Sequence, residues 1–308
     1  MSNISIGGGS RCRRRPGVSL ATGVWLIALA WTIALRAEDE ETKPAADKSG
    51  YTLFNPTPAA LMREFNPDRP DFTESPFTVD AGHFQLEMGF FSFTRNTAGG
   101  VRTDATVYGS FNAKLGVLNN MDIEFVLDPY TVIQSRTPGF GTSTVRGVGD
   151  ALIRLKVNLW GNDGPQPGTG PTAFGLLPFV KIPTADRDIG NRRVEGGLIL
   201  PLSVSLPGDF DLSAMVEIDF LRNEANTHYG TEYVQSVSLS HKIVGQLAGY
   251  VEYVGMSPLR TGNSYRAYFS TGLMYQAGKN LEFDAGTLIG LSGKSDAFNV
   301  FSGFTVRF

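Results

Sequence analysis

Apolar and polar side chains alternate with a period of two along most of this chain, which is the pattern of a β-strand. In 102–117 the even-numbered positions from Arg102 to Lys114 are polar, and the positions between them are mainly apolar. The same alternation recurs in 150–159 and 211–220. No sustained helical period follows residue 37, so the chain is predicted to be all-β.

Along the whole chain up to residue 308, the alternation predicts about twelve strands, each near the length that a tilted strand needs to cross a bilayer. They span 83–94, 102–117, 121–129, 147–160, 173–183, 194–206, 210–221, 232–243, 246–255, 265–276, 281–291 and 298–308. Tight turns alternate with longer links, as in a barrel that spans the outer membrane. The link 130–146 is predicted as an outer loop, whereas 161–172 is unexpectedly long for the side of the short turns. The predicted fold is a single antiparallel transmembrane β-barrel.

The charged positions share the polar face of their predicted strands, as a membrane barrel requires, since a lipid-facing charge in mid-strand costs about 2–4 kcal/mol. A soluble fold would also alternate, but it would turn its polar face outward. Long strands and an apolar, alternating C-terminus favour the membrane barrel, in which the polar face lines the lumen. The predicted lumen-lining residues are Glu87, Arg102, Asp104, Lys114, Asp122, Glu124, Asp150, Arg154, Lys156, Lys181, Glu195, Glu217, Asp219, Lys242, Glu252, Arg266, Glu282 and Asp284.

The first 37 residues have the layout of a secretory signal peptide. Four arginines between Arg11 and Arg15 precede an apolar stretch over 18–35, and acidic residues begin directly after Ala37. A membrane anchor of similar length is the alternative. Removal of residues 1–37 would leave 22 basic against 30 acidic residues, so the mature protein is expected to be acidic. The single cysteine, Cys12, excludes an internal disulfide and a cysteine-based metal site.

Residues 38–81 are predicted to form a periplasmic extension, and residues 82–308 the barrel. The extension mixes aromatic groups with five prolines between residues 56 and 76, which prevent a spanning strand or a long helix. We expect it to fold into or across the periplasmic mouth of the barrel and to meet lumen charges there. A disordered tail is the alternative. The motif residues that would make these contacts are Arg69, Asp71, Thr73 and Glu74.

Several short blocks of sequence resemble those of one bacterial family. The first is DRPDFTESPFTV at 68–79, followed by AGHFQLE at 81–87, and it is the most specific. GVGD at 147–150, PFVKIPT at 178–184 and VEGGLILP at 194–201 are similar to further blocks of the family. The family is the outer-membrane, transporter-like group labelled with a MetA pathway of phenol degradation. The resemblance implies a barrel for the passage of small compounds, with aromatic compounds as candidates.

The sequence provides little for catalysis. A serine hydrolase needs a nucleophile beside a histidine base, and the chain has only three histidines. His241 lies on the apolar face of its predicted strand, whereas Ser238 and Ser240 point to the other face. The protein is therefore predicted not to be an enzyme, and no cofactor is predicted.

Carboxylates along one strand raise the question of a metal site. Asp122, Glu124 and Asp128 share one face of a predicted strand. Residues two apart on a strand are about 7 Å from one another, so these three favour a charge ladder along the pore over one coordination shell. No metal and no nucleic-acid partner is predicted.

Two functions remain open at this point. One is a channel for passive diffusion of small compounds, hydrophobic or aromatic ones among them; the other is a closed barrel with a structural or adhesive role. About twelve strands lie between small filled barrels and wide porins, so the strand number does not decide. The surplus of acidic lining would favour cations and uncharged solutes weakly. The expected partners are outer-membrane lipid and the barrel-assembly machinery, which would recognise the C-terminal Phe308.

Overall fold

One closed antiparallel sheet makes up the computed structural model, which describes residues 47–308 except 167, 224–225 and 259–264. The signal peptide predicted for 1–37 lies outside the described residues. The strands are β1 (Phe84–Ala98), β2 (Val101–Tyr108), β3 (Phe111–Leu118), β4 (Met121–Leu127), β5 (Tyr130–Thr137), β6 (Gly141–Gly147), β7 (Ala151–Trp160), β8 (Thr172–Ile182), β9 (Glu195–Leu206), β10 (Phe210–Arg222), β11 (Tyr229–Val244), β12 (Leu247–Pro258), β13 (Arg266–Gly278), β14 (Leu281–Gly290) and β15 (Phe298–Arg307). Among the described residues, no helix is long and apolar enough to cross a membrane.

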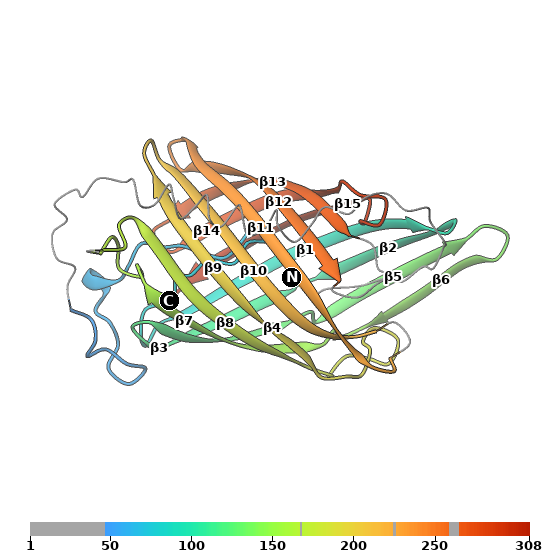
Figure 1. The fold of residues 1–308 in the computed structure, drawn as a ribbon, viewed down its shortest axis with the longest axis horizontal. Helices are drawn as coiled ribbons and strands as arrows, with labels where there is room; N and C mark the ends of the chain where they lie inside the picture. The colour runs from blue at the N-terminus through green and yellow to red at the C-terminus, as the bar shows by residue number, and fades with distance from the viewer. Residues whose placement is uncertain (1–46, 167, 224–225, 259–264) are drawn as a thin grey trace.

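The sheet closes into a barrel because β1 pairs with β15 (Figure 1). The pairs β2 and β3, β4 and β5, and β6 and β7 are each two halves of one bent crossing, so fifteen strands make twelve crossings. β1 itself pairs with β3 along its first part and with β2 along its second. The predicted all-β barrel of about twelve strands is confirmed.

The prediction of a loop at 130–146 is wrong. This region forms β5 and β6, a hairpin that projects from one end of the barrel (Figure 1). Pro129 and the glycines at 147 and 149 interrupt the alternation on either side, because proline cannot donate to the ladder and glycine weakens a strand. The outer part of the hairpin, 134–144, has Phe140 at its turn as its one large apolar residue, so it lacked the apolar stripe by which the other strands were predicted.

The wall of the barrel is apolar outside, and much of its inner face is polar. On β4, the Ile123 and Phe125 side chains are 45% and 40% exposed, whereas the neighbouring Asp122 and Glu124 are fully buried. A soluble barrel or sandwich has the opposite arrangement. The apolar face of the alternating strands therefore points outward, as in a membrane barrel, in which apolar groups face lipid.

Both ends of the barrel sequence meet at one rim. The backbone N–H of Phe308 donates to the carbonyl oxygen of Phe84 at 2.8 Å, and the two phenyl rings stack with centroids 6.1 Å apart. His83 contacts the Phe308 carbonyl oxygen through its Nδ1. We call this rim, with the turns at 119–120, 207–209, 245–246 and 279–280, the terminal end. The opposite rim, which carries the β5–β6 hairpin, is the loop end.

A β-bulge exchanges the two faces along β1. The pairing of β1 with β15 shifts between Gly89 and Phe91, so one extra residue is accommodated there. Gln85 and Glu87 are buried below the shift, and Ser92 and Thr94 are hydrogen-bonded to the inward-facing Asn299 above it. The inward positions change from odd to even numbers, so side chains such as Arg95 lie on the outer face.

Candidate functional site

A segment of the chain before β1 enters the barrel interior. Residues 47–83, which we call the inner segment, begin outside the rim at the terminal end, and their later part, around 68–76, runs between the walls (Figure 1). The segment has one turn of 3₁₀-helix, Ala59–Leu61, and is otherwise extended or irregular. Its prolines explain this, since a residue without an N–H cannot join a ladder. Its polar groups bond to the walls instead.

One buried ion network joins the inner segment to β3 and β7. The Asp68 carboxylate accepts hydrogen bonds from the ammonium groups of Lys114 and Lys156, the latter at 2.6 Å. Lys114 also pairs with Glu87 of β1, and all four side chains are buried. A buried charge is tolerated only with a partner, so each member depends on the others.

A second ion pair lies beside this network. The Glu74 carboxylate accepts a hydrogen bond from Arg154 of β7 at 2.5 Å. One carboxylate oxygen from each of Asp68, Glu74 and Glu124 lies within 4.8 Å of the others, a spacing that a metal ion could use. Lys156 and Arg154 already supply positive charge to these three acids, with Lys156 3.3 Å from Glu124. The arrangement therefore favours a network of ion pairs.

The opposite wall supplies carboxylates to the inner segment. Glu252 of β12 accepts the backbone N–H groups of Phe72 and Thr73 at 3.0 and 2.7 Å, and also the Thr73 hydroxyl. Asp284 of β14 accepts two hydrogen bonds from the Arg69 guanidinium at 2.9 and 2.6 Å. A bidentate pair of this kind fixes orientation as well as position.

The long link 161–171 contacts the inner segment at the terminal end. Asp163 of this link pairs with Lys48 at 2.6 Å and with Arg63 at 3.2 Å. Arg63 also donates to the backbone and side-chain oxygens of Asn119. Burial raises the pKa of Asp163, but Arg63 and Lys48 outweigh that effect and hold this pKa below its ordinary value of 3.8. The unusual length of the link thus has a structural reason, since it reaches the inner segment.

An apolar cluster faces the interior of the wall from β8 to β13. It consists of the buried side chains of Leu177, Ile199, Met215, Val234, Val254, Met256 and Tyr268. Phe72 of the inner segment, together with Phe179 and Leu288, packs against it. We call this set the apolar sector. Sequence reasoning missed it, because these residues take inward positions that the alternation assigned to polar side chains.

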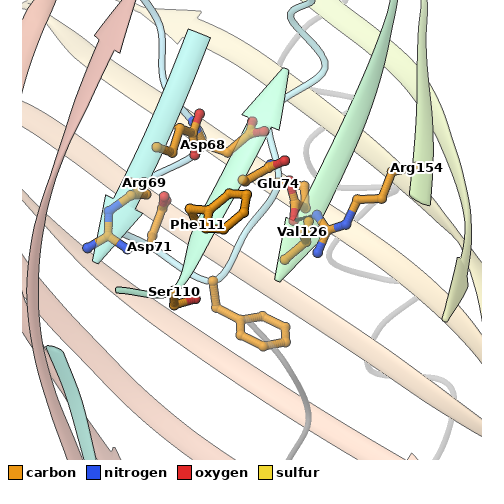
Figure 2. Close-up of a pocket in the computed structure, with 11 residues that line it drawn as sticks. Asp68, Arg69, Asp71, Glu74, Ser110, Phe111, Val126 and Arg154 are labelled. Atoms are coloured by element: carbon orange, nitrogen blue, oxygen red, sulfur yellow. Dashed lines mark hydrogen bonds and ion pairs between the residues drawn. The ribbon is translucent and has the colours of Figure 1, made fainter. Parts of the chain in front are cut away.

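A small cavity of about 70 Å³ separates the inner segment from the bent wall. Figure 2 shows Asp68, Arg69 and Glu74 of the inner segment together with Phe111, Val126 and Arg154 of the wall, all of which border this cavity. Asp71 and Phe72 also line the cavity. Its lining combines charged groups with the apolar Phe72 and Val126, so it is not uniformly polar.

The structure places many of the predicted lumen residues inside the barrel. Those with buried side chains are Glu87, Lys114, Asp122, Glu124, Arg154, Lys156, Glu217, Asp219, Glu252 and Asp284. Lys181 pairs with Asp150 and Glu195 at 2.8 Å each toward the loop end, and Arg266 pairs with Glu232. Glu282 is half-buried, and Lys242 is exposed next to the turn at 245–246.

Arg102 and Asp104 do not line the lumen, and this part of the prediction is wrong. Asp104 is the cross-strand partner of Arg95, which in turn lies opposite Phe298 of β15. Phe298 shares its face with Phe304, whose ring contacts the lipid-facing Phe283. Because paired residues lie on one face of a sheet, Asp104 and Arg102 lie outside. The bulge in β1 is the cause, and a count of alternation within β2 alone could not reveal it.

Several contact residues of the site were not predicted. Asp80 is fully buried and lies 3.3 Å from Lys48, 3.5 Å from Arg63 and 3.7 Å from Arg307. Asp68 was part of the quoted motif, but no role was assigned to it. Their signal in the sequence is weak, because charges in a segment without regular alternation have no predictable face.

Comparison with known proteins identifies the family. The family model described as "Putative MetA-pathway of phenol degradation" matches residues 67–308. This chain belongs to that family. The resemblance noted in the sequence is thereby confirmed, and the match begins just before Asp68, the buried centre of the ion network. No curated protein matches this chain.

Solved structures with similar folds are bacterial outer-membrane barrels. The chain is similar to an outer membrane channel from Pseudomonas putida F1, with a TM-score of 0.57 and 11% identity over 80% of this chain and 100% of that one. It is also similar to the β domain of the Bordetella autotransporter BrkA, with a TM-score of 0.47 and 14% identity over 73% and 98% of the two chains. The first similarity shows that the two chains share a fold.

Proposed function

We propose that this protein is an outer-membrane channel through which small hydrophobic compounds, aromatic ones included, diffuse passively. The apolar sector is the observation that carries the proposal. A barrel that conducted only ions or sugars would gain nothing from a group of aliphatic and aromatic side chains on its inner wall, whereas an apolar solute needs such a surface. The family label and the description of the Pseudomonas putida protein as a channel support this function.

The inner segment is the gate of the proposed channel. In the structure its Phe72 covers the apolar sector, and Leu177, Val234 and Val254 of that sector are fully buried. The conformation described is therefore closed at this level. Displacement of Phe72 would uncover an apolar surface for the solute. Within the extension predicted at 38–81, the part around 68–77 acts as the plug.

The setting of the channel follows from its fold. Outer-membrane barrels of this kind have their short turns on the periplasmic side, so the terminal end faces the periplasm and the loop end faces outward. A signal peptide at 1–37 would direct export. The exposed Phe308 at the end of β15 would present the C-terminal signal to the assembly machinery. No catalytic step is part of the proposal.

Single-channel conductance and solute efflux from liposomes test the proposal. We compare the unaltered mature protein with Glu252→Gln, which weakens the acceptor of three hydrogen bonds from Phe72 and Thr73. The amide oxygen of glutamine still accepts these hydrogen bonds, but without charge. We therefore expect the closed conformation of the inner segment to lose about 1–2 kcal/mol of stability relative to the open one, so that the channel opens more often. Efflux of a small phenol should rise with it.

The control is Asp211→Asn, since Asp211 is exposed and bonds only to Ser205 among the described residues. Folding of each variant is checked by heat-modifiable migration. The alternative function, a closed structural or adhesive barrel, is favoured by the complete burial of the apolar sector. The structural or adhesive role would be supported, and the channel proposal contradicted, if a folded Glu252→Gln protein conducts no ions and releases no phenol.

A further inference from the structure

Three arginines and one acid lie on the neighbouring strands β1, β2 and β5 of the outer face, near the loop end of the barrel. Arg95 and Arg102 both pair with Asp104, each with a shortest N···O distance of 2.7 Å. Arg136 of β5 is the direct cross-strand partner of Arg102. The bulge in β1 and the cross-strand pairing place all of them on the outer face.

The charges of this group do not balance. Like charges directly opposite one another on neighbouring strands are destabilising. Asp104 offsets one positive charge, and within the described part of the chain no ion pair is formed by Arg136. The group therefore carries an excess of positive charge on an exposed surface, and an external anion would relieve the repulsion.

The position of the group relative to the bilayer indicates which anion. The Arg95 guanidinium lies 5.3 Å from the ring centroid of Phe93 and 5.4 Å from that of Phe298. Aromatic rings mark the interface on both sides of a membrane barrel, so charges just beyond them lie at headgroup depth. Arg95 also accepts a backbone hydrogen bond from Ala297, in the 291–297 turn at the loop end.

We propose that Arg95, Arg102 and Arg136 form a binding site for the phosphate groups of a phosphorylated glycolipid in the outer leaflet. Guanidinium groups match phosphate oxygens in charge and geometry. Asp104 pairs with Arg95 and Arg102 and offsets one of the three positive charges, so removal of this carboxylate should strengthen the attraction of the site for phosphate. The inference rests on the outer-membrane location in the proposed function but is independent of transport.

Binding of lipid A to the full, folded protein in detergent tests the site, with native mass spectrometry as the readout. The double variant R102Q/R136Q should bind lipid A about tenfold or more weakly, since each charge-assisted hydrogen bond is worth about that factor. The matched control R187Q/R193Q removes two arginines from the 183–194 link at the same end. It should bind as the unaltered protein does.

Two further binding measurements identify the ligand and the role of Asp104. Dephosphorylated lipid A should bind the unaltered protein as weakly as lipid A binds the double variant, and inorganic phosphate alone should compete only at much higher concentration. Asp104→Asn should bind lipid A several-fold more tightly, a direction that a purely structural role for these residues does not produce. Equal loss in R187Q/R193Q, or no difference between the two lipids, would overturn the proposal.

Discussion

The two halves of the barrel wall supply groups of opposite charge to the inner segment. The wall from β1 to β7 is bent, and its Lys114, Lys156 and Arg154 supply cations to Asp68 and Glu74 of the segment. The wall from β8 to β15 has unbroken strands of 10–16 residues. It supplies carboxylates to the Arg69 guanidinium and to two backbone N–H groups, and it carries the apolar sector.

This difference indicates how the inner segment, the gate of the proposed channel, can stay attached to one part of the wall while it separates from the other. Its acids are bound by buried cations on the bent wall, where loss of one partner leaves charges without water. The unbroken wall provides one ion pair, between Arg69 and Asp284, and otherwise hydrogen bonds to Glu252 and the burial of Phe72. The structure therefore favours a hinge at the bent wall and opening beside the apolar sector.

The largest effect should come from the bent wall. Asp68→Asn leaves the buried Lys114 and Lys156 without their shared carboxylate, and we expect a loss of about 3–5 kcal/mol of unfolding free energy. Denaturant titration followed by heat-modifiable migration measures it. Adding Lys114→Met should recover part of the loss. If Asp68→Asn were no more destabilising than Glu252→Gln, the assignment of the stronger anchor to this wall would be wrong.

A smaller but qualitative effect should reveal the exchange of faces at the β1 bulge. In a background with Cys12→Ser, Arg95→Cys should react several-fold faster with a bulky, membrane-impermeant maleimide than Thr94→Cys, because only residue 95 faces outward. Mass spectrometry of the labelled protein gives the rates. Equal rates, or faster labelling at position 94, would contradict the register of β1 with β15.

The smallest effect should be the pH dependence of the clamp at the terminal end. The pKa of Asp163 in the folded protein is depressed by Arg63 and Lys48, so its contribution is present above the ordinary value of 3.8 and is lost as pH falls through the lower, folded value. Cleavage by pepsin near Lys48 should accelerate in that acidic range. Asp163→Asn should show the faster cleavage already at the upper end of pepsin's range, and an unchanged profile in this variant would remove Asp163 from the clamp.

Much of the fold could be predicted because the membrane makes one face of each strand apolar. Ile123 and Phe125 alternate with Asp122 and Glu124, and the cost of a lipid-facing charge allows one arrangement only. The β5–β6 hairpin was missed because it extends past the region where this cost applies. Without an apolar face, its strands carry the composition of a loop.

The site was less predictable, for two physical reasons. Alternation tells which residues share a face but not what covers that face, so the burial of Leu177, Val234 and Val254 beneath Phe72 had no sequence signal. Alternation is also counted within one strand, whereas the bulge in β1 changes the face of its neighbours through pairing. Asp104 was assigned to the wrong side for that reason.

The closure of β1 on β15 has a consequence for the order of assembly. These strands are the first and last of the barrel, so the ring is complete only after the whole chain has arrived. The inner segment is attached to β1, yet it bonds to Glu252 and Asp284, which follow it by 180 and 215 residues. Contacts of such long sequence separation form slowly, because the chain must first lose the entropy of a very large loop. The inner segment therefore has to reach the interior while the last strands join, and it connects the late strands to the early ones.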